Sequence, residues 1–145
     1  LGAYGRRMEN PMSLAALLRA ILELPGLGRL RLSSIEPMRF SRAIVDTAAE
    51  NPLFAPHFHI PLQSGDNDIL KRMNRNYTSE EYARLVESIH SQIPLAAIGA
   101  DLMAGFPGEE AKAHRNTYDL VKDLDVSYFH VFPFSPRQGT AAWDF

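Results

Sequence analysis

The chain has 145 residues, of which 46% are hydrophobic and 22% are charged, and its formal net charge is −2. This size and composition predict one globular unit with a sizeable core, and the charge supplies no broad basic surface for nucleic acid. The absence of cysteine excludes disulfides and thiolate-held clusters among these residues. No stretch is apolar enough to span a membrane and no signal pattern opens the chain, so we expect a cytoplasmic protein that is not membrane-bound.

Helical and extended patterns alternate along the whole chain. Ser13 precedes apolar residues at helical spacing, and Thr78 with Glu81 forms the pattern of a capping box. In chain order, we predict a helix from Ser13 to Pro25-Gly26, a strand at 30–34, a helix from Ser41 to Asn51-Pro52, a strand at 57–62, helices at 67–73 and from Thr78 to Pro94, a strand at 96–103, a helix at 110–124 and a strand at 128–132.

The predicted strands begin roughly 30 to 40 residues apart, which is the spacing of successive β/α units with right-handed crossovers. The fold class is therefore α/β with a parallel sheet of about four β/α units. A closed eight-unit barrel needs about 250 residues. The chain is accordingly predicted to be either a small open α/β domain or part of a larger barrel.

Polar side chains gather where each predicted strand ends. They are Ser33, Ser34 and Glu36 after the first strand, Gln63, Ser64 and Asp66 after the second, Asp101 and Glu109 after the third, and Ser135 and Arg137 after the fourth. In parallel barrels this edge carries the chemistry. Each residue could equally cap a helix or complete a turn, and we expect Asp66 to be an N-cap. The two roles are compatible, because neighbouring amides of the same helix end stay available for an anionic ligand.

Four segments together carry a family resemblance. They are RLRLSSIEP at 29–37, HIPLQSGD at 59–66, GFPGE at 105–109 and FPFSPRQGT at 132–140. In this order they resemble the radical S-adenosylmethionine methylthiotransferases, over essentially the whole chain. The form of the 29–37 segment is most similar to the branch that acts on threonylcarbamoyladenosine in tRNA.

The resemblance implies a six-strand partial barrel of the radical S-adenosylmethionine type, with residues 1–145 as its C-terminal part. In that family three cysteines after the first strand hold a 4Fe-4S cluster, and an N-terminal domain holds another. This chain matches the region after those ligands, so we expect it to be inactive alone. We also expect it to self-associate through the strand at 30–34 or an open barrel face.

The resemblance implies the following activity for the parent protein. S-adenosylmethionine on the cluster yields a deoxyadenosyl radical, which abstracts hydrogen from an adenine carbon so that sulfur and then methyl can be added. The implied partners are tRNA and an electron donor, and with a net charge of −2 any RNA must be held by local patches or other segments.

Individual roles are predicted from side-chain chemistry. Gln63 and Ser64 are candidates for the polar parts of the cofactor, and Arg75 for its carboxylate. Gly105 and Phe106 could form an adenine platform, although Phe106 could equally be a packed core residue. The remaining candidates are Asp101 for the cofactor and Glu36 and Arg137 for the substrate side. No catalytic residue and no metal ligand is assigned.

Two alternatives stay open. His57 and His59 lie two apart on one strand and so share a face, and with His130 and Asp101 they could bind zinc for metal-dependent hydrolysis. The simpler interpretation is that these histidines are hydrogen-bonded inside a barrel. The second alternative is a truncated paralogue that serves as a non-catalytic binding module.

Overall fold

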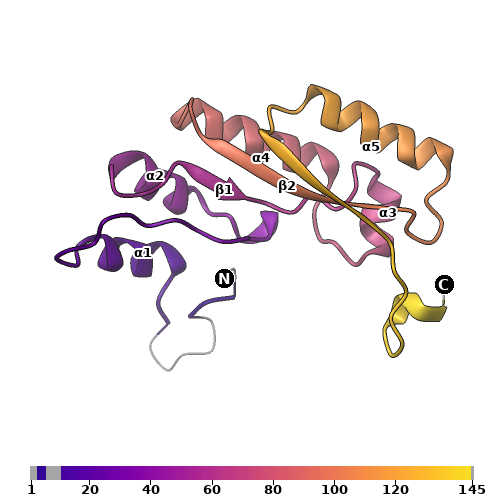
Figure 1. The fold of residues 1–145 in the computed structure, drawn as a ribbon, viewed down its shortest axis with the longest axis horizontal. Helices are drawn as coiled ribbons and strands as arrows, with labels where there is room; N and C mark the ends of the chain where they lie inside the picture. Colours follow the sequence, from indigo (N-terminus) through magenta and orange to yellow (C-terminus); the bar gives the residue numbers. More distant parts are fainter. Residues whose placement is uncertain (1–2, 6–10, 145) are drawn as a thin grey trace.

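The computed structural model describes residues 3–5 and 11–144, and it forms an α/β structure around a parallel sheet (Figure 1). In chain order the elements are α1 (Leu14–Leu22), the 3-10 helix η1 (Pro37–Arg39), α2 (Arg42–Glu50), β1 (His57–His59), α3 (Asn67–Arg72), α4 (Ser79–Gln92), β2 (Ala97–Ala104), α5 (Ala111–Asp123), β3 (Tyr128–Pro133) and the 3-10 helix η2 (Ala141–Asp144). No described helix is long and apolar enough to cross a membrane.

The sheet has the order β1-β2-β3, and both pairs are parallel. Helices α3 and α4 connect β1 to β2, and α5 connects β2 to β3, as β/α crossovers require. The register pairs His59 with Gly99 and Asp101 with His130. The predicted α/β fold class with a parallel sheet is confirmed.

The predicted strand at 30–34 does not form as a regular strand. Leu30 makes an isolated parallel bridge with Phe54, and the amide of Ile35 reaches the carbonyl of His59 at 3.0 Å. Between these points the ladder is interrupted, because the amide of His57 turns back to the carbonyl of Ala55 at 2.7 Å. The segment is therefore bonded at one end to the residues before β1 and at the other end to the last residue of β1, without continuous pairing.

The helix starts follow the predicted caps. The Ser13 side chain accepts from the amide of Ala16, Asp66 caps α3, and Thr78 with Glu81 closes both bonds of the capping box. Ser41 is the N-cap residue of α2, but its side chain makes no capping hydrogen bond. The local sequence signals thus position α1, α3 and α4 directly.

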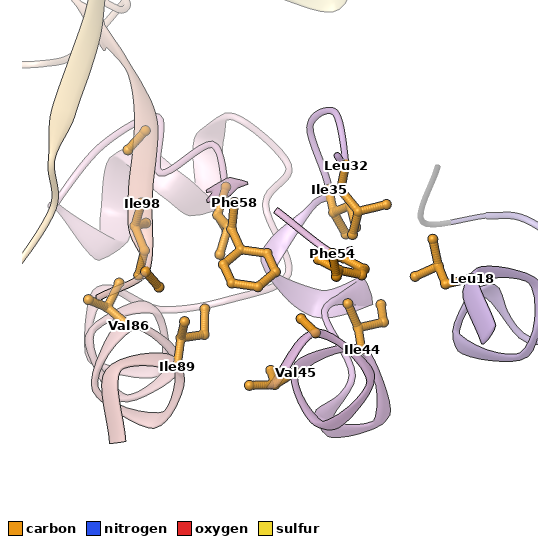
Figure 2. Close-up of a cluster of buried hydrophobic side chains, with 14 of the residues drawn as sticks. Leu18, Leu32, Ile35, Ile44, Val45, Phe54, Phe58, Val86, Ile89 and Ile98 are labelled. Atoms are coloured by element: carbon orange, nitrogen blue, oxygen red, sulfur yellow. The ribbon is translucent and has the colours of Figure 1, made fainter. Parts of the chain in front are cut away.

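One face of the sheet packs against helices and forms the main core. Figure 2 shows Val86 and Ile89 of α4, Ile44 and Val45 of α2, and Leu18 of α1 directed toward side chains of the extended segments. Phe58, Ile60, Ile98, Ala100 and Leu102 are buried on this side. Burial of the phenylalanine, isoleucine and leucine side chains among them stabilises a fold by about 1.5–3 kcal/mol each.

Helix α5 is less buried than predicted. Ala113 is the buried residue of this helix, whereas Thr117, Leu120, Val121 and Leu124 are only half-buried. The physical reason is that α5 leads into β3, which is an edge of the described sheet and leaves Val131 and Phe132 exposed. The side of the sheet opposite the main core is polar.

Candidate functional site

The polar face of the sheet borders a pocket of about 590 Å³. Because alternate residues of a strand point to opposite faces, the strands that bury Phe58 and Ile98 against the helices turn His57, His59 and Asp101 the other way. The lining residues are Arg31, Leu32, Ser33, Ser34, His57, His59, Asp101, Tyr128 and His130. The sequence thus produces a sheet with one apolar face and one polar, imidazole-rich face.

Asp101 is the centre of this face. Its Oδ1 lies 3.0 Å from Nε2 of His59 and 3.4 Å from Nδ1 of His130. The side chains of His59 and Asp101 are 12% and 21% exposed, whereas that of His130 is 55% exposed. Three groups that can each bind a proton or a cation therefore converge at the bottom of an open pocket.

Tyr128 links this group to His57. Its hydroxyl lies 3.3 Å from Nδ1 of His59 and 2.9 Å from Nε2 of His57. The guanidinium of Arg31 also contacts the His57 ring, with Nη2 2.8 Å from Nε2. Burial lowers the pKa of His57, and the charge of Arg31 lowers it further, so His57 is held neutral beside the arginine.

The loop after β1 holds Gln63 in a left-handed conformation with φ of 70°. Its amide donates to the carbonyl of Asp101 at 2.7 Å, and its carbonyl accepts from the amide of Met103 at 2.9 Å. A non-glycine residue at positive φ costs of the order of 1–3 kcal/mol and occurs preferentially at functional sites. The backbone of Gln63 is therefore fixed at the carboxyl end of the sheet.

Ser64 lies next to Gln63 but points elsewhere. Its side chain is completely buried, with Oγ 3.2 Å from the hydroxyl of Thr117, and it accepts a hydrogen bond from the amide of Asp66. Gly65 approaches α5 so closely that a Cβ would lie 2.7 Å from Cα of Thr117. The hydroxyl of Ser64 thus shapes the loop, and its predicted contact with the cofactor stays a prediction.

The loop at 105–109, the second loop predicted to bind the cofactor, is held by a hydrogen bond between its own residues. The carboxylate of Glu109 accepts a hydrogen bond from the amide of Gly105, which has φ of 74°. Phe106 is 6% exposed and packs edge-on against Phe134 with ring centroids 5.2 Å apart. The packed-core interpretation of Phe106 therefore has direct support, and the adenine-platform role remains a prediction.

Two other predicted residues, Glu36 and Arg75, form an ion pair. Nη1 of Arg75 donates to both carboxylate oxygens of Glu36, at 2.8 and 3.0 Å. Nε of Arg75 is buried and finds no hydrogen-bond partner within residues 3–5 and 11–144. Arg137 lies in the exposed segment after β3, where its carbonyl accepts from Thr140. The structure thus joins Glu36 to Arg75, and among the residues that it describes the Arg137 side chain forms no hydrogen bond or ion pair.

Sequence reasoning missed Arg31 and Tyr128 as members of the polar face. A signal was present, because Tyr128 and His130 lie two apart on one strand, as do His57 and His59. The alternative zinc site named His57, His59, His130 and Asp101. The structure brings His59, Asp101 and His130 together. The ring of His57 contacts Tyr128 and Arg31 instead.

Comparison with known proteins identifies the class. The model of the radical SAM superfamily matches residues 7–121, and the chain belongs to this superfamily. Its relatives include the "Threonylcarbamoyladenosine tRNA methylthiotransferase MtaB" of Thermotoga maritima, 43% identical over 98% of this chain and 32% of the relative. The resemblance predicted from the sequence motifs is therefore confirmed.

Two further relatives carry another name. Proteins of Thermotoga petrophila and Alkaliphilus oremlandii, each called "tRNA-2-methylthio-N(6)-dimethylallyladenosine synthase", are 40% and 37% identical over 97% and 98% of this chain. The chain covers 32% and 30% of their lengths. It thus spans about a third of the curated relatives that it matches.

The superfamily implies S-adenosylmethionine and a 4Fe-4S cluster. The chain contains no cysteine, so its residues offer no thiolate and do not fit the cluster. They fit the organic cofactor better, because Gln63, with φ of 70°, follows β1, and Arg75 pairs with Glu36 while its Nε has no partner among the described residues.

Proposed function

We propose that the protein carrying this chain is a radical S-adenosylmethionine methylthiotransferase that modifies a hypermodified adenosine next to the anticodon of tRNA. The single observation that carries the proposal is the similarity along nearly the whole chain to relatives named for tRNA methylthiolation. The domain match is consistent with it. When bound, S-adenosylmethionine supplies the methyl group and the means of hydrogen abstraction.

We infer that the substrate is threonylcarbamoyladenosine. The support is the 43% identity to a relative named for that nucleoside, against 37% and 40% for the two relatives named for dimethylallyladenosine. The polar face agrees with this choice. Arg31, Ser33 and His130 offer donors to a polar, carboxylate-bearing substituent, whereas a dimethylallyl group is apolar and has no atom to accept from them.

Within the proposed enzyme this chain's residues bind and orient the ligands. Gln63, Arg75, Asp101 and the loop at Gly105-Phe106, with the backbone around Ser64, would hold S-adenosylmethionine at the carboxyl ends of the strands. Glu36 pairs with Arg75 and so orients its guanidinium, and it faces the substrate side together with Arg137. The partners are tRNA and an electron donor, in the cytoplasm.

The proposal is tested in tRNA. The gene that encodes this chain, over its full reading frame, is expressed in a bacterial strain that lacks its own methylthiotransferases, and the tRNA nucleosides are analysed by mass spectrometry. We expect the 2-methylthio form of threonylcarbamoyladenosine. A methylthio group on dimethylallyladenosine instead would correct the substrate, and unmodified tRNA in a strain with soluble protein would overturn the proposal.

A pair of arginine variants tests the role of the site. Arg75→Ala should abolish or strongly reduce the modification, because it removes the fork beside Glu36. Arg84→Ala is the matched control, since Arg84 is exposed on α4 and lies outside the site. Equal modification by both variants would remove Arg75 from the cofactor site.

A further inference from the structure

The proposed function uses Asp101 and His130 singly, but neither it nor the comparisons use the group that these two residues form with His59. One ligand atom from each of these residues lies within 4.8 Å of the other two. The carboxylate oxygen is 3.0 Å from one imidazole nitrogen and 3.4 Å from the other. We propose that these three side chains form a binding site for a divalent transition-metal cation of the zinc class.

The spacing matches the size of a metal coordination sphere. Zinc binds imidazole nitrogen and carboxylate oxygen at about 2.0–2.2 Å in tetrahedral geometry, which separates neighbouring ligand atoms by roughly 3.3 Å. The two nitrogen-to-oxygen distances lie on either side of that value. Two histidines and one carboxylate are also a donor set that divalent zinc, cobalt and iron use.

The backbone fixes the three ligands rigidly. His59, Asp101 and His130 lie on three adjacent strands, and Asp101 stands directly opposite His130 in the parallel register. The amide of Ile60, which follows His59, donates to the carbonyl of Gly99. Ligands held by paired strands are better positioned than ligands on loops, so binding requires little rearrangement.

A neighbouring hydroxyl orients one ligand ring. Nδ1 of His59 lies 3.3 Å from Oη of Tyr128, which in turn lies 2.9 Å from Nε2 of His57. With a cation on Nε2 of His59, the proton of that ring resides on Nδ1 and is donated to Tyr128. This is the arrangement in which a second residue holds the tautomer of a metal-bound histidine.

The site also has an entry path and an open position. The three ligands line the pocket of about 590 Å³, and the side chain of His130 is 55% exposed. Three protein ligands leave the fourth tetrahedral position free for water or for an oxygen or nitrogen of a ligand in the pocket. The geometry therefore supports binding of a cation with one exchangeable coordination position.

The test uses this chain alone, without tRNA or S-adenosylmethionine, and so its outcome is independent of the proposed function. The dialysed chain is titrated with Co²⁺ while its visible absorption is recorded, and Zn²⁺ is then added as competitor. We expect one Co²⁺ per chain with a tetrahedral spectrum that Zn²⁺ abolishes. Ring resonances of His59 and His130 should shift on Zn²⁺ binding, and those of His114, exposed on α5, should not.

Three variants separate this site from unspecific binding. His130→Ala and Asp101→Asn should each weaken Zn²⁺ binding more than about tenfold, and Tyr128→Phe should weaken it about tenfold by removing the orienting hydroxyl. His114→Ala is the matched control and should bind like the unchanged chain. Circular dichroism reports whether each variant is folded.

Two results would overturn the proposal. One is the absence of stoichiometric Co²⁺ or Zn²⁺ binding by the folded chain, which would show that the three side chains are only hydrogen-bonded to one another. The other is equal affinity in His130→Ala and His114→Ala, which would place the bound ion elsewhere. Because His130 is half-exposed, its replacement is not expected to unfold the chain.

Discussion

The hydroxyl of Thr117 accepts a hydrogen bond from the amide of Gly65 at 2.9 Å, across 52 positions of sequence. The same oxygen lies 3.2 Å from Oγ of Ser64 and 3.2 Å from the carbonyl of Ala113. One side chain of α5 therefore holds the loop that follows β1, together with its neighbour Gln63. The shape of the candidate cofactor loop depends on this contact between the two crossovers.

Thr117→Val should destabilise the chain by about 1–3 kcal/mol, because the buried amide of Gly65 and the hydroxyl of Ser64 lose a partner. Thr117→Ser keeps the oxygen and should cost less. Urea denaturation followed by circular dichroism measures both free energies of unfolding. Equal stability of Thr117→Val and the unchanged chain would show that the loop does not depend on this hydroxyl.

Acid should weaken the cap of α3. Burial opposes ionisation of Asp66, but hydrogen bonds from the amide of Ile69, from Asn116 and from the amide of Asp68 outweigh it and lower the pKa of this carboxyl. The unfolded chain then binds a proton more readily than the folded chain. The resulting stability is complete above the ordinary aspartate pKa and is lost as the pH falls through the lowered value.

Asp66→Asn is the variant that isolates this effect. Asparagine caps helices about as well as aspartate but does not titrate. Between about pH 5 and pH 2, the free energy of unfolding should therefore fall less steeply in Asp66→Asn than in the unchanged chain. Identical slopes in urea denaturation across this range would contradict the assignment.

Gly99 provides the space for Tyr128 on the polar face. A Cβ at this position would overlap the ring and hydroxyl of Tyr128, so Gly99→Ala should displace the ring and cost about 1–3 kcal/mol. Gly28→Ala is the matched control, because nothing lies within 4 Å of its added Cβ. Thermal denaturation measures the unfolding midpoint of each variant. Equal midpoints would show that the ring of Tyr128 moves aside without a loss of stability.

The predicted self-association remains to be measured, and the structure identifies the edge at β3 as its best candidate surface. Val131 and Phe132 on this edge strand are 62% and 51% exposed, and exposed apolar edges promote pairing between chains. Light scattering should show a particle mass that rises with concentration. Slower amide exchange at 30–34 on concentrating the chain would instead favour association through that segment.

Val131→Lys should suppress the association, because an edge lysine opposes strand pairing. Leu95→Lys is the control, since Leu95 is 92% exposed in the turn between α4 and β2. A strictly monomeric unchanged chain, or equal effects of the two substitutions, would refute the edge as the cause.

Local signals predicted the local features well. The Thr78 and Glu81 pattern forms its capping box, and Asp66 caps α3, because these bonds join residues within one turn. The prediction of a regular strand at 30–34 was wrong. The neighbouring segment interrupts the pairing, because the amide of His57 donates to the carbonyl of Ala55. The residue pattern of a single strand does not show whether the neighbouring segment pairs with it along its whole length.

Prediction of the candidate site from the sequence was limited in the same way. The shared face of His57 and His59 follows from their spacing, but the placement of His130 opposite Asp101 depends on the register between β2 and β3, which the crossover helix does not encode. The bond between Ser64 and Thr117 joins two crossovers in the same way. One contact across elements, the approach of His59, Asp101 and His130, was among the alternatives considered from the sequence. The contacts of Arg31, Tyr128 and Thr117 were missed.

Isotopic labelling of the methyl group tests the proposed methylthiotransferase activity. Cells that lack their own methylthiotransferases express the gene encoding this chain over its full reading frame, grow on methionine with a deuterated methyl group, and yield tRNA for nucleoside mass spectrometry. We predict threonylcarbamoyladenosine with a methylthio group that carries the deuterated methyl. Threonylcarbamoyladenosine that stays unmodified, or a methylthio group without the label, would contradict a methylthiotransferase that uses S-adenosylmethionine.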